Sequence, residues 1–327
     1  DGIKEDLLRG VKRITVVACG TAAHAGYAGR TVIEKLAKIP TQVDIASEFR
    51  YRDPIIEKDE LVIVISQSGQ TADTIEAMRE AKRRGAKTLA ITNVVGSTVS
   101  IEADAVLHTR AGVEIAVAST KAYITQLMAL YMIALELGRI NGVLSEDKYS
   151  YYLEELEGMS EKSRLMLNTK EQMQKLASER FMEKSVFYIG RGVDNALAME
   201  ASLKLKEISY IHSEAYAAGE LKHGTIALIE DDTLVVALAT QKSLIEKTAS
   251  NIQEVKARGA YVVAVCPEGD ALVEKVADST VEIPRCEDLF APILAVIPMQ
   301  LFAYYVSLAK GYDVDKPRNL AKTVTVE

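Results

Sequence analysis

A cluster of hydroxyl side chains around one glycine is the first feature of this sequence that could bind a ligand. Ser66, Ser68 and Thr71 surround Gly69, directly after the apolar run 61–65 and before an amphipathic pattern. This order predicts a buried strand, a tight turn and the start of a helix. A helix start offers unpaired N–H groups and a partial positive charge, and hydroxyls add donors, so the turn suits a phosphate. It is not a Walker loop, because GxxxxGK[ST] is absent; an ordinary helix cap, which also favours Ser and Thr, is the alternative.

Candidates for acid–base chemistry lie in the second half of the chain. Lys204 and Glu207 are three residues apart within the helical pattern 196–208, so they share a face. A surface ion pair is the alternative interpretation. His223 lies in the small-residue stretch 213–224, between two glycines, where a histidine can transfer protons.

Strands that alternate with helices position these residues. The expected strands cover residues 14–18, 42–46, 61–66, 88–92, 105–109, 186–189, 234–238, 261–265 and 280–283. This alternation predicts βαβ units, parallel sheets and right-handed crossovers. The segments 122–137 and 293–308 are apolar almost all round, but they are interrupted and shorter than the roughly 20 residues of a membrane span. We therefore expect them to be deeply buried helices.

The two halves of the chain repeat the same plan. Matching elements are offset by about 172 residues, which predicts a duplicated α/β domain. The pairs are Ile14 with Val186, Leu61 with Leu234, Gly85 with Gly259 and Ile124 with Ile297. We expect a first domain at 1–139, a helical linker at 140–183, a second domain at 184–312 and a tail at 313–327 that lies over a site. Because residues 239–242 (ATQK) replace 66–69 (SQSG), only the first half keeps the anion site.

Composition narrows the function further. Lys plus Arg total 39 and Asp plus Glu total 46, and no basic block stands out, so we expect no nucleic-acid partner. Three distant cysteines fit neither a zinc site nor a disulfide framework and indicate a reducing cytoplasm. The polar start predicts no signal peptide, and the lack of an initiator Met suggests a fragment of a longer protein. No GxGxxG or metal-ligand cluster is present, so we expect no cofactor and no metal.

Several longer motifs resemble the sugar isomerase (SIS) domain pair of the glucosamine-6-phosphate synthase family, the glutamine:fructose-6-phosphate amidotransferases. They are residues 19–21 (CGT), 47–52 (SEFRYR), 66–74 (SQSGQTADT), 117–121 (VASTK), 204–212 (KLKEISYIH), 214–224 (EAYAAGELKHG) and 317–322 (PRNLAK). The resemblance covers essentially the whole chain. It implies two tandem SIS domains, each a parallel sheet with helices on both faces. Nothing in the chain resembles the family's N-terminal glutaminase domain, so the resemblance implies the isomerase domain alone.

The resemblance also implies a role for individual residues. The residues that bind the sugar phosphate would be Thr21, Ser66, Gln67, Ser68 and Thr71, and the backbone at Val117 and Ala321 would contact the sugar. Glu207 would move the proton between C1 and C2 with Lys204 beside it, and Lys322 would lie near the carbonyl carbon, where a transient Schiff base is considered. His223 would assist ring opening from the neighbouring subunit of a homodimer. Ala22, where the family often has Ser, removes one possible phosphate donor.

The implied reaction converts fructose 6-phosphate and ammonia to glucosamine 6-phosphate by ring opening and proton transfer. It needs a phosphate anchor, a carboxylate over C1 and C2 and a proton-transfer group, all of which the inventory supplies. Two alternatives remain open. One is a sugar-amine deaminase or deglycase with the same double SIS fold, and the other is a non-catalytic sugar-phosphate sensor.

Overall fold

The computed structural model describes residues 3–325 and divides the chain into two compact units. Unit 1 comprises Asp1–Glu154 with Ala321–Glu327, and unit 2 comprises Glu155–Leu320. Each unit is described by itself below. The domain boundaries expected from the sequence stay a prediction.

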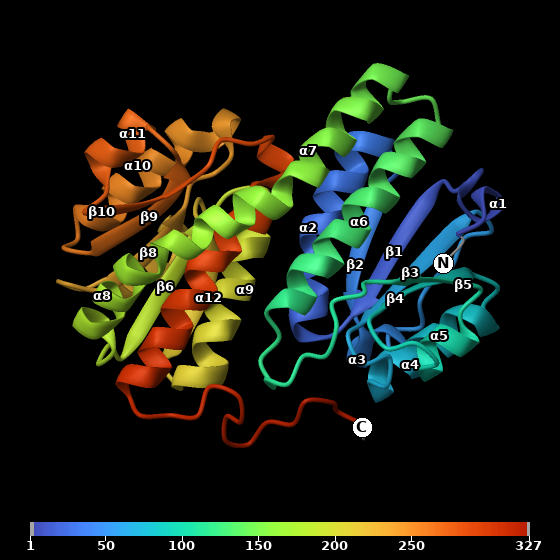
Figure 1. Cartoon of the computed structure of the whole chain (residues 1–327), viewed down its shortest axis with the longest axis horizontal. Helices are drawn as coiled ribbons and strands as arrows, with labels where there is room; N and C mark the ends of the chain where they lie inside the picture. Colours follow the sequence, from blue (N-terminus) through green and yellow to red (C-terminus); the bar gives the residue numbers. More distant parts are fainter. Residues whose placement is uncertain (1–2, 326–327) are drawn as a thin grey trace. The chain divides into compact units, whose positions relative to one another are not determined.

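Unit 1 is built on a five-stranded parallel sheet with the order β2-β1-β3-β4-β5 (Figure 1). Its strands are β1 (Arg13–Ala18), β2 (Thr41–Ile45), β3 (Glu60–Ser66), β4 (Lys87–Thr92) and β5 (Ala105–His108). All seven residues of β3 are buried, which is the pattern of a central parallel strand covered on both faces. All five strands were predicted from their apolar runs.

Helices cover both faces of this sheet. On one face, α2 (Gly20–Ala37) packs against α6 (Lys121–Ile140). The other face carries α3 (Ala46–Phe49), α4 (Ala72–Arg83) and α5 (Thr98–Glu102), and Val62 and Val64 of β3 point into that layer. The short α1 (Glu5–Leu8) precedes the sheet, and α7 (Glu146–Met166) begins in this unit.

Unit 2 repeats this arrangement with the strand order β10-β9-β8-β6-β7, again all parallel. Its strands are β6 (Ser185–Gly190), β7 (His212–Ala217), β8 (Leu234–Leu238), β9 (Tyr261–Pro267) and β10 (Ser279–Ile283). The strand β7 was not predicted from the sequence, in which the stretch 213–224 around His223 was expected to be a loop. The other four strands were predicted.

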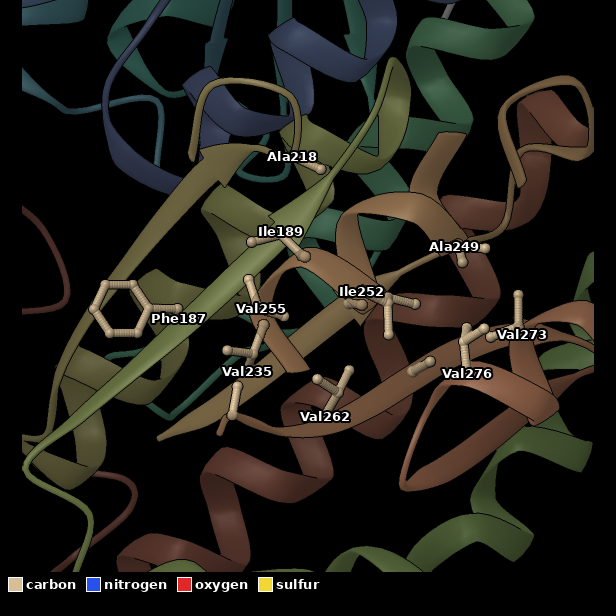
Figure 2. Packing of buried hydrophobic residues seen from close by; sticks show 14 of the residues in the cluster. Phe187, Ile189, Ala218, Val235, Ala249, Ile252, Val255, Val262, Val273 and Val276 are labelled. Carbon is tan, nitrogen blue, oxygen red and sulfur yellow. The ribbon is translucent and has the colours of Figure 1, made fainter. Parts of the chain in front are cut away.

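The helices of unit 2 also form two layers. One face of the sheet is covered by α10 (Ile245–Lys256) and α11 (Ala271–Val276). Apolar side chains of both helices, such as Ile252 and Val273, belong to one buried cluster with Phe187, Ile189 and Val235 of the strands (Figure 2). On the other face, α12 (Ala291–Ala309) packs against α8 (Lys170–Arg180) and α9 (Val193–Ser209). Short 3₁₀ turns connect the elements at η1 (Leu167–Thr169), η2 (Leu221–His223), η3 (Thr225–Leu228), η4 (Lys242–Leu244) and η5 (Asp288–Phe290).

The most apolar helix of unit 2 is a core helix. The segment Asp288–Ala309 is long and apolar enough to cross a membrane, yet 78% of its apolar window is buried in the protein. Pro298 lies inside α12 and removes one backbone donor. Both units are therefore three-layer αβα structures, as the sequence predicted.

Both sheets have the same position for a ligand. The strand order reverses between β1 and β3 in unit 1 and between β6 and β8 in unit 2. Ligands of open parallel sheets bind outside the carboxyl ends of the strands at such a switch point. We therefore expect ligand-binding residues in the loops after β1, β3, β6 and β8.

Candidate functional site

The hydroxyl turn, residues 66–71, lies at the carboxyl end of β3. Ser66 is the last residue of the strand, and Thr71 is the N-cap residue of α4. The Ser66 hydroxyl lies 3.0 Å from the Thr71 hydroxyl and accepts a hydrogen bond from the Gly69 N–H at 3.0 Å. The Ser68 hydroxyl accepts a hydrogen bond from the Gln70 N–H at 3.2 Å. The turn thus gathers hydroxyl and N–H groups at the start of a 12-residue helix, which is suitable for an anion.

A second segment, residues 97–99, lies against the hydroxyl turn. The N–H of Val99 donates to the Gly69 carbonyl at 3.2 Å, and the Thr98 hydroxyl donates to the Gln70 side chain at 2.7 Å. Gly69 has a φ of +65°, and a Cβ at this position would lie 2.1 Å from the Ser97 Oγ. Only glycine fits both the backbone conformation and the space.

Thr21 lies on the neighbouring strand–helix connection of unit 1. It is half-buried in the first turn of α2, which follows β1. Ala18 at the end of β1 pairs with Ile65 at the end of β3, so Thr21 and the hydroxyl turn are at the same edge of the sheet. The structure therefore brings the predicted phosphate-binding residues of unit 1 to its switch point.

The acid–base candidates of unit 2 form a buried ion cluster on α9. The Lys204 Nζ lies 2.5 Å from the Glu207 Oε2 and 3.5 Å from the Glu200 Oε1. Burial disfavours the charged amine, but Glu200 and Glu207 outweigh this effect and raise the pKa of Lys204. Lys204 and Glu200 are almost completely buried, whereas 21% of the Glu207 side chain is exposed. Glu207 is therefore the member of the cluster that a substrate can reach.

Glu207 also lines a shallow hollow on the surface of unit 2. The same hollow is lined by Tyr210, at the end of α9, and by Arg318 of the C-terminal motif. The Arg318 guanidinium lies 4.1 Å from the centre of the Tyr210 ring, and the Arg318 N–H donates to the Tyr210 hydroxyl at 2.8 Å. His223 is exposed at the end of η2, and within residues 3–325 no hydrogen bond or ion pair joins it to Glu207.

Lys322 is held by the loop before α6, within unit 1. Its Nζ donates to the Glu114 Oε2 at 2.6 Å, to the Ala116 carbonyl at 2.8 Å and to the Ser119 hydroxyl at 3.4 Å. These partners flank Val117, so Lys322 and the adjoining Ala321 lie beside the segment that contains Val117. A further hydrogen bond, from the Ala72 N–H to the Val324 carbonyl at 3.1 Å, holds the tail at the start of α4.

Glu114 organises this loop and was not identified from the sequence. Its Oε1 accepts hydrogen bonds from the backbone N–H of Thr120 at 2.9 Å and of Ala122 at 3.3 Å, which caps α6. Burial favours the neutral acid, but the hydrogen bonds from Lys322 and Thr120 outweigh it and hold the pKa of Glu114 below its ordinary value. An acidic residue shortly before an apolar helix was the only signal in the sequence.

Glu200 is a second residue of the cluster that was not predicted from the sequence. Its spacing of four residues from Lys204 was the available signal. Among residues 3–325, no group of three or more His, Cys, Asp or Glu side chains is arranged to hold a metal ion. The hydroxyl turn of unit 1 is suited to bind an anion, and the Lys204–Glu207 pair of unit 2 is suited to transfer a proton.

Comparison with known proteins shows the family to which the chain belongs. The profile of the SIS domain family matches residues 7–136 and 181–310, one match in each half of the chain. The glutamine–fructose-6-phosphate aminotransferase [isomerizing] of Clostridium tetani is 58% identical over 325 residues, which are 99% of this chain and 54% of that protein. The chain thus spans about half the length of the curated relatives it matches.

Solved structures agree with this comparison. The C-terminal domain of glucosamine-fructose-6-phosphate aminotransferase from Francisella tularensis superposes with a TM-score of 0.92 at 40% identity, covering 96% of this chain and 89% of that one. Glucosamine-6-phosphate deaminase from Thermotoga maritima has a TM-score of 0.78 at 24% identity, covering 98% and 92% of the two chains. At that identity the deaminase shows a shared fold alone.

Proposed function

Because the chain belongs to the SIS domain family and matches the C-terminal, isomerase half of glutamine–fructose-6-phosphate aminotransferases, we propose that it converts fructose 6-phosphate and ammonia to glucosamine 6-phosphate. In the whole enzyme, ammonia would come from glutamine, hydrolysed by a part outside this chain. The observation that carries the proposal is the Glu207 carboxylate, which is partly exposed and held by the buried ammonium of Lys204 at 2.5 Å. A buried ion cluster contributes little to stability by itself, so its presence favours a catalytic role.

The proposal assigns phosphate binding to unit 1. Thr21, Ser66, Gln67, Ser68 and Thr71 would donate hydrogen bonds to the phosphate, each worth roughly 1.5–3 kcal/mol for a charged acceptor. The backbone at Val117 and Ala321 would contact the sugar. This anchor would fix the orientation of the reacting carbons C1 and C2 of the substrate.

The proposal assigns proton transfer to unit 2. After ring opening, assisted by His223, ammonia adds at the C2 carbonyl and water leaves, which gives an imine. Glu207 removes a proton from C1, the electron pair forms a C1=C2 double bond, and the nitrogen at C2 takes up a proton from solvent, which gives an enolamine. Glu207 then returns a proton to C2, and the hydroxyl at C1 loses its proton to solvent and becomes the aldehyde of glucosamine 6-phosphate. Lys204 compensates the negative charge of Glu207 throughout, and no redox step is required.

Lys322 would act near the carbonyl carbon. A Schiff base requires a neutral amine, so the ammonium must lose a proton before it can attack C2. The ammonium is paired with Glu114, whose Oε2 lies 2.6 Å from the Nζ, so Lys322 would have to leave this ion pair before it reacts. We also propose a cytoplasmic homodimer, in which His223 of the partner subunit completes each site.

Hydrogen exchange tests the role of Glu207 without any ammonia. In the absence of an amine, the same proton transfer proceeds through an enediol and gives glucose 6-phosphate. Wild type in D₂O should place deuterium at C2 of glucose 6-phosphate and exchange it into C1 of fructose 6-phosphate, both followed by NMR. Glu207→Gln should do neither while it still binds fructose 6-phosphate by calorimetry.

A matched control separates this role from a general effect of the substitution. Glu246 is exposed on α10, and Glu246→Gln should exchange deuterium at the wild-type rate. Exchange at the wild-type rate in Glu207→Gln would refute the assignment. Mixing Glu207→Gln and His223→Ala chains tests the shared site: recovery of activity supports the homodimer, and no recovery after confirmed subunit exchange contradicts it.

A further inference from the structure

The two repeats can be compared residue by residue at their switch points. Gly20 and Gly192 open the matching strand–helix connections, and both have positive φ values, +52° and +60°. Two residues later, Ala22 and Asp194 each donate a backbone hydrogen bond to the carbonyl three residues back, at 3.2 Å in both repeats. Position 194 of unit 2 therefore corresponds to position 22 of unit 1.

The Asp194 carboxylate accepts hydrogen bonds from the loop that follows β8. Its Oδ2 accepts the Thr240 N–H at 2.8 Å, and its Oδ1 accepts the Thr240 hydroxyl at 2.5 Å. The backbone N–H of Gln241 is a further donor, and the residue is only 1% exposed. Leu238 at the end of β8 pairs opposite Gly190 as Ile65 pairs opposite Ala18, so Thr240 corresponds to Gln67 of the hydroxyl turn. The donors that hold Asp194 are thus the counterparts of the donors proposed for the phosphate.

A second difference between the repeats accompanies this one. The last residue of β6 is Gly190, whereas the last residue of β1 is Ala18. A Cβ at Gly190 would lie 2.5 Å from the Asp194 carbonyl oxygen and 2.9 Å from the Asp194 Cβ. The glycine therefore allows the first turn of α9 to approach the strand, which carries the carboxylate into the site.

We propose that Asp194 is a built-in anion, which occupies in unit 2 the position that the substrate phosphate takes in unit 1. The inference rests on the phosphate-binding role proposed for the hydroxyl turn. Both groups are anions that present oxygen acceptors to backbone N–H groups at helix starts. Burial and the nearby charge of Asp288 raise the pKa of Asp194 to about 6, although the hydrogen bonds from Thr240 and Gln241 act in the opposite direction. The carboxyl is therefore mostly ionised at neutral pH. Each chain would then bind one sugar phosphate, although it contains two repeats.

Transfer of the carboxylate to unit 1 tests the correspondence directly. Ala22→Asp should place an anion against the N–H groups of the hydroxyl turn and weaken fructose 6-phosphate binding at least tenfold by calorimetry. Ala22→Asn has nearly the same size without the charge and should lose much less affinity. Equal losses in the two variants would show that bulk alone excludes the phosphate and would overturn the proposal.

Ser68→Ala separates this proposal from the proposed function. If Ser68→Ala weakens binding while Ala22→Asp does not, the hydroxyl turn binds phosphate but the correspondence with Asp194 is wrong. If neither variant weakens binding, the phosphate-binding role of unit 1 is itself wrong.

The reverse exchange provides an independent test. Asp194→Ala should be less stable than wild type, and inorganic phosphate should raise its unfolding midpoint by about 2 °C or more beyond the rise in wild type. Chloride at equal ionic strength should not. The same rise in both proteins would contradict an anion site in unit 2. If Asp194→Ala does not fold, the Ala22 variants still decide the matter.

Discussion

Removal of the buried ammonium of Lys204 should destabilise the protein strongly, and the distances in the cluster give the size of the effect. In Lys204→Met, Glu200 loses a cation 3.5 Å away. At an effective dielectric constant of about 20, this attraction is on the order of 5 kcal/mol. Breaking a buried pair by removing one partner costs about 3–5 kcal/mol for the same reason. We expect a loss in that range, against a total stability of roughly 5–15 kcal/mol for a typical protein.

Urea unfolding at two pH values measures this loss and identifies its cause. The raised pKa of Lys204 means that the folded wild type keeps the ammonium charged throughout this range. In Lys204→Met the carboxylates can be neutralised only by protons, so the deficit should shrink between pH 7 and pH 5. Adding Glu200→Gln to Lys204→Met should restore part of the stability at pH 7, because it removes the uncompensated charge.

The neighbouring lysine supplies a matched control. Lys206 is exposed on the same helix, and Lys206→Met should change the unfolding free energy by about 0.5 kcal/mol or less. A deficit below about 1 kcal/mol in Lys204→Met, or one of equal size at both pH values, would refute the reasoning from a buried charge cluster.

Two further predictions concern unit 1. Gly69→Ala should lower the unfolding free energy by more than Gly112→Ala. Both glycines have positive φ, but only at Gly69 would the added Cβ meet another side chain, the Ser97 Oγ at 2.1 Å. Equal losses of the two variants in urea unfolding would contradict a steric clash. Glu114→Gln should speed tryptic cleavage after Lys322 several-fold at pH 7, because the amide cannot pair with the ammonium as the carboxylate does. Because the pKa of Glu114 is lowered in the folded protein, its ion pair with Lys322 is present above the pKa of Glu114 in the unfolded chain and is lost as the pH falls through its pKa in the folded protein. Resistance to trypsin that neither acid nor the variant changes would contradict this anchoring.

Nine of the ten strands within residues 3–325 were predicted from the sequence, because strands that alternate with helices are visible without any tertiary information. The exception, β7, reads His212-Ser-Glu-Ala-Tyr-Ala217 and pairs only with β6 at the edge of its sheet. An edge strand can be polar, since fewer of its side chains are covered. The internal repeat could have predicted this strand, because the residues of β2 shifted by about 172 positions correspond to residues 213–217.

The site was predictable where it depends on local spacing and not where it depends on distant contacts. Lys204 and Glu207 are neighbours on one helix, so their pairing followed from the sequence. Glu114 and Lys322 are 208 residues apart, and only the folded tail brings them together. Asp194 resembled any acidic residue in the first turn of a helix, and its burial against Thr240 became visible only in the structure.

The same comparison of repeats supports the different roles that we propose for the two halves. Where α9 carries Glu200, Lys204 and Glu207, the matching positions of α2 hold Ala28, Val32 and Lys35, of which the first two are fully buried in an apolar layer. An apolar face is the simpler way to pack such a helix, because buried ion clusters rarely stabilise a fold more than hydrophobic residues of similar size. The charged cluster in α9 is therefore poorly explained by packing and well explained by proton transfer. Unit 1 shows the converse: α2 is apolar at two of these positions, and the role proposed for this unit lies in the hydroxyl turn. The two repeats thus share one fold, and the proposal assigns a different role to each.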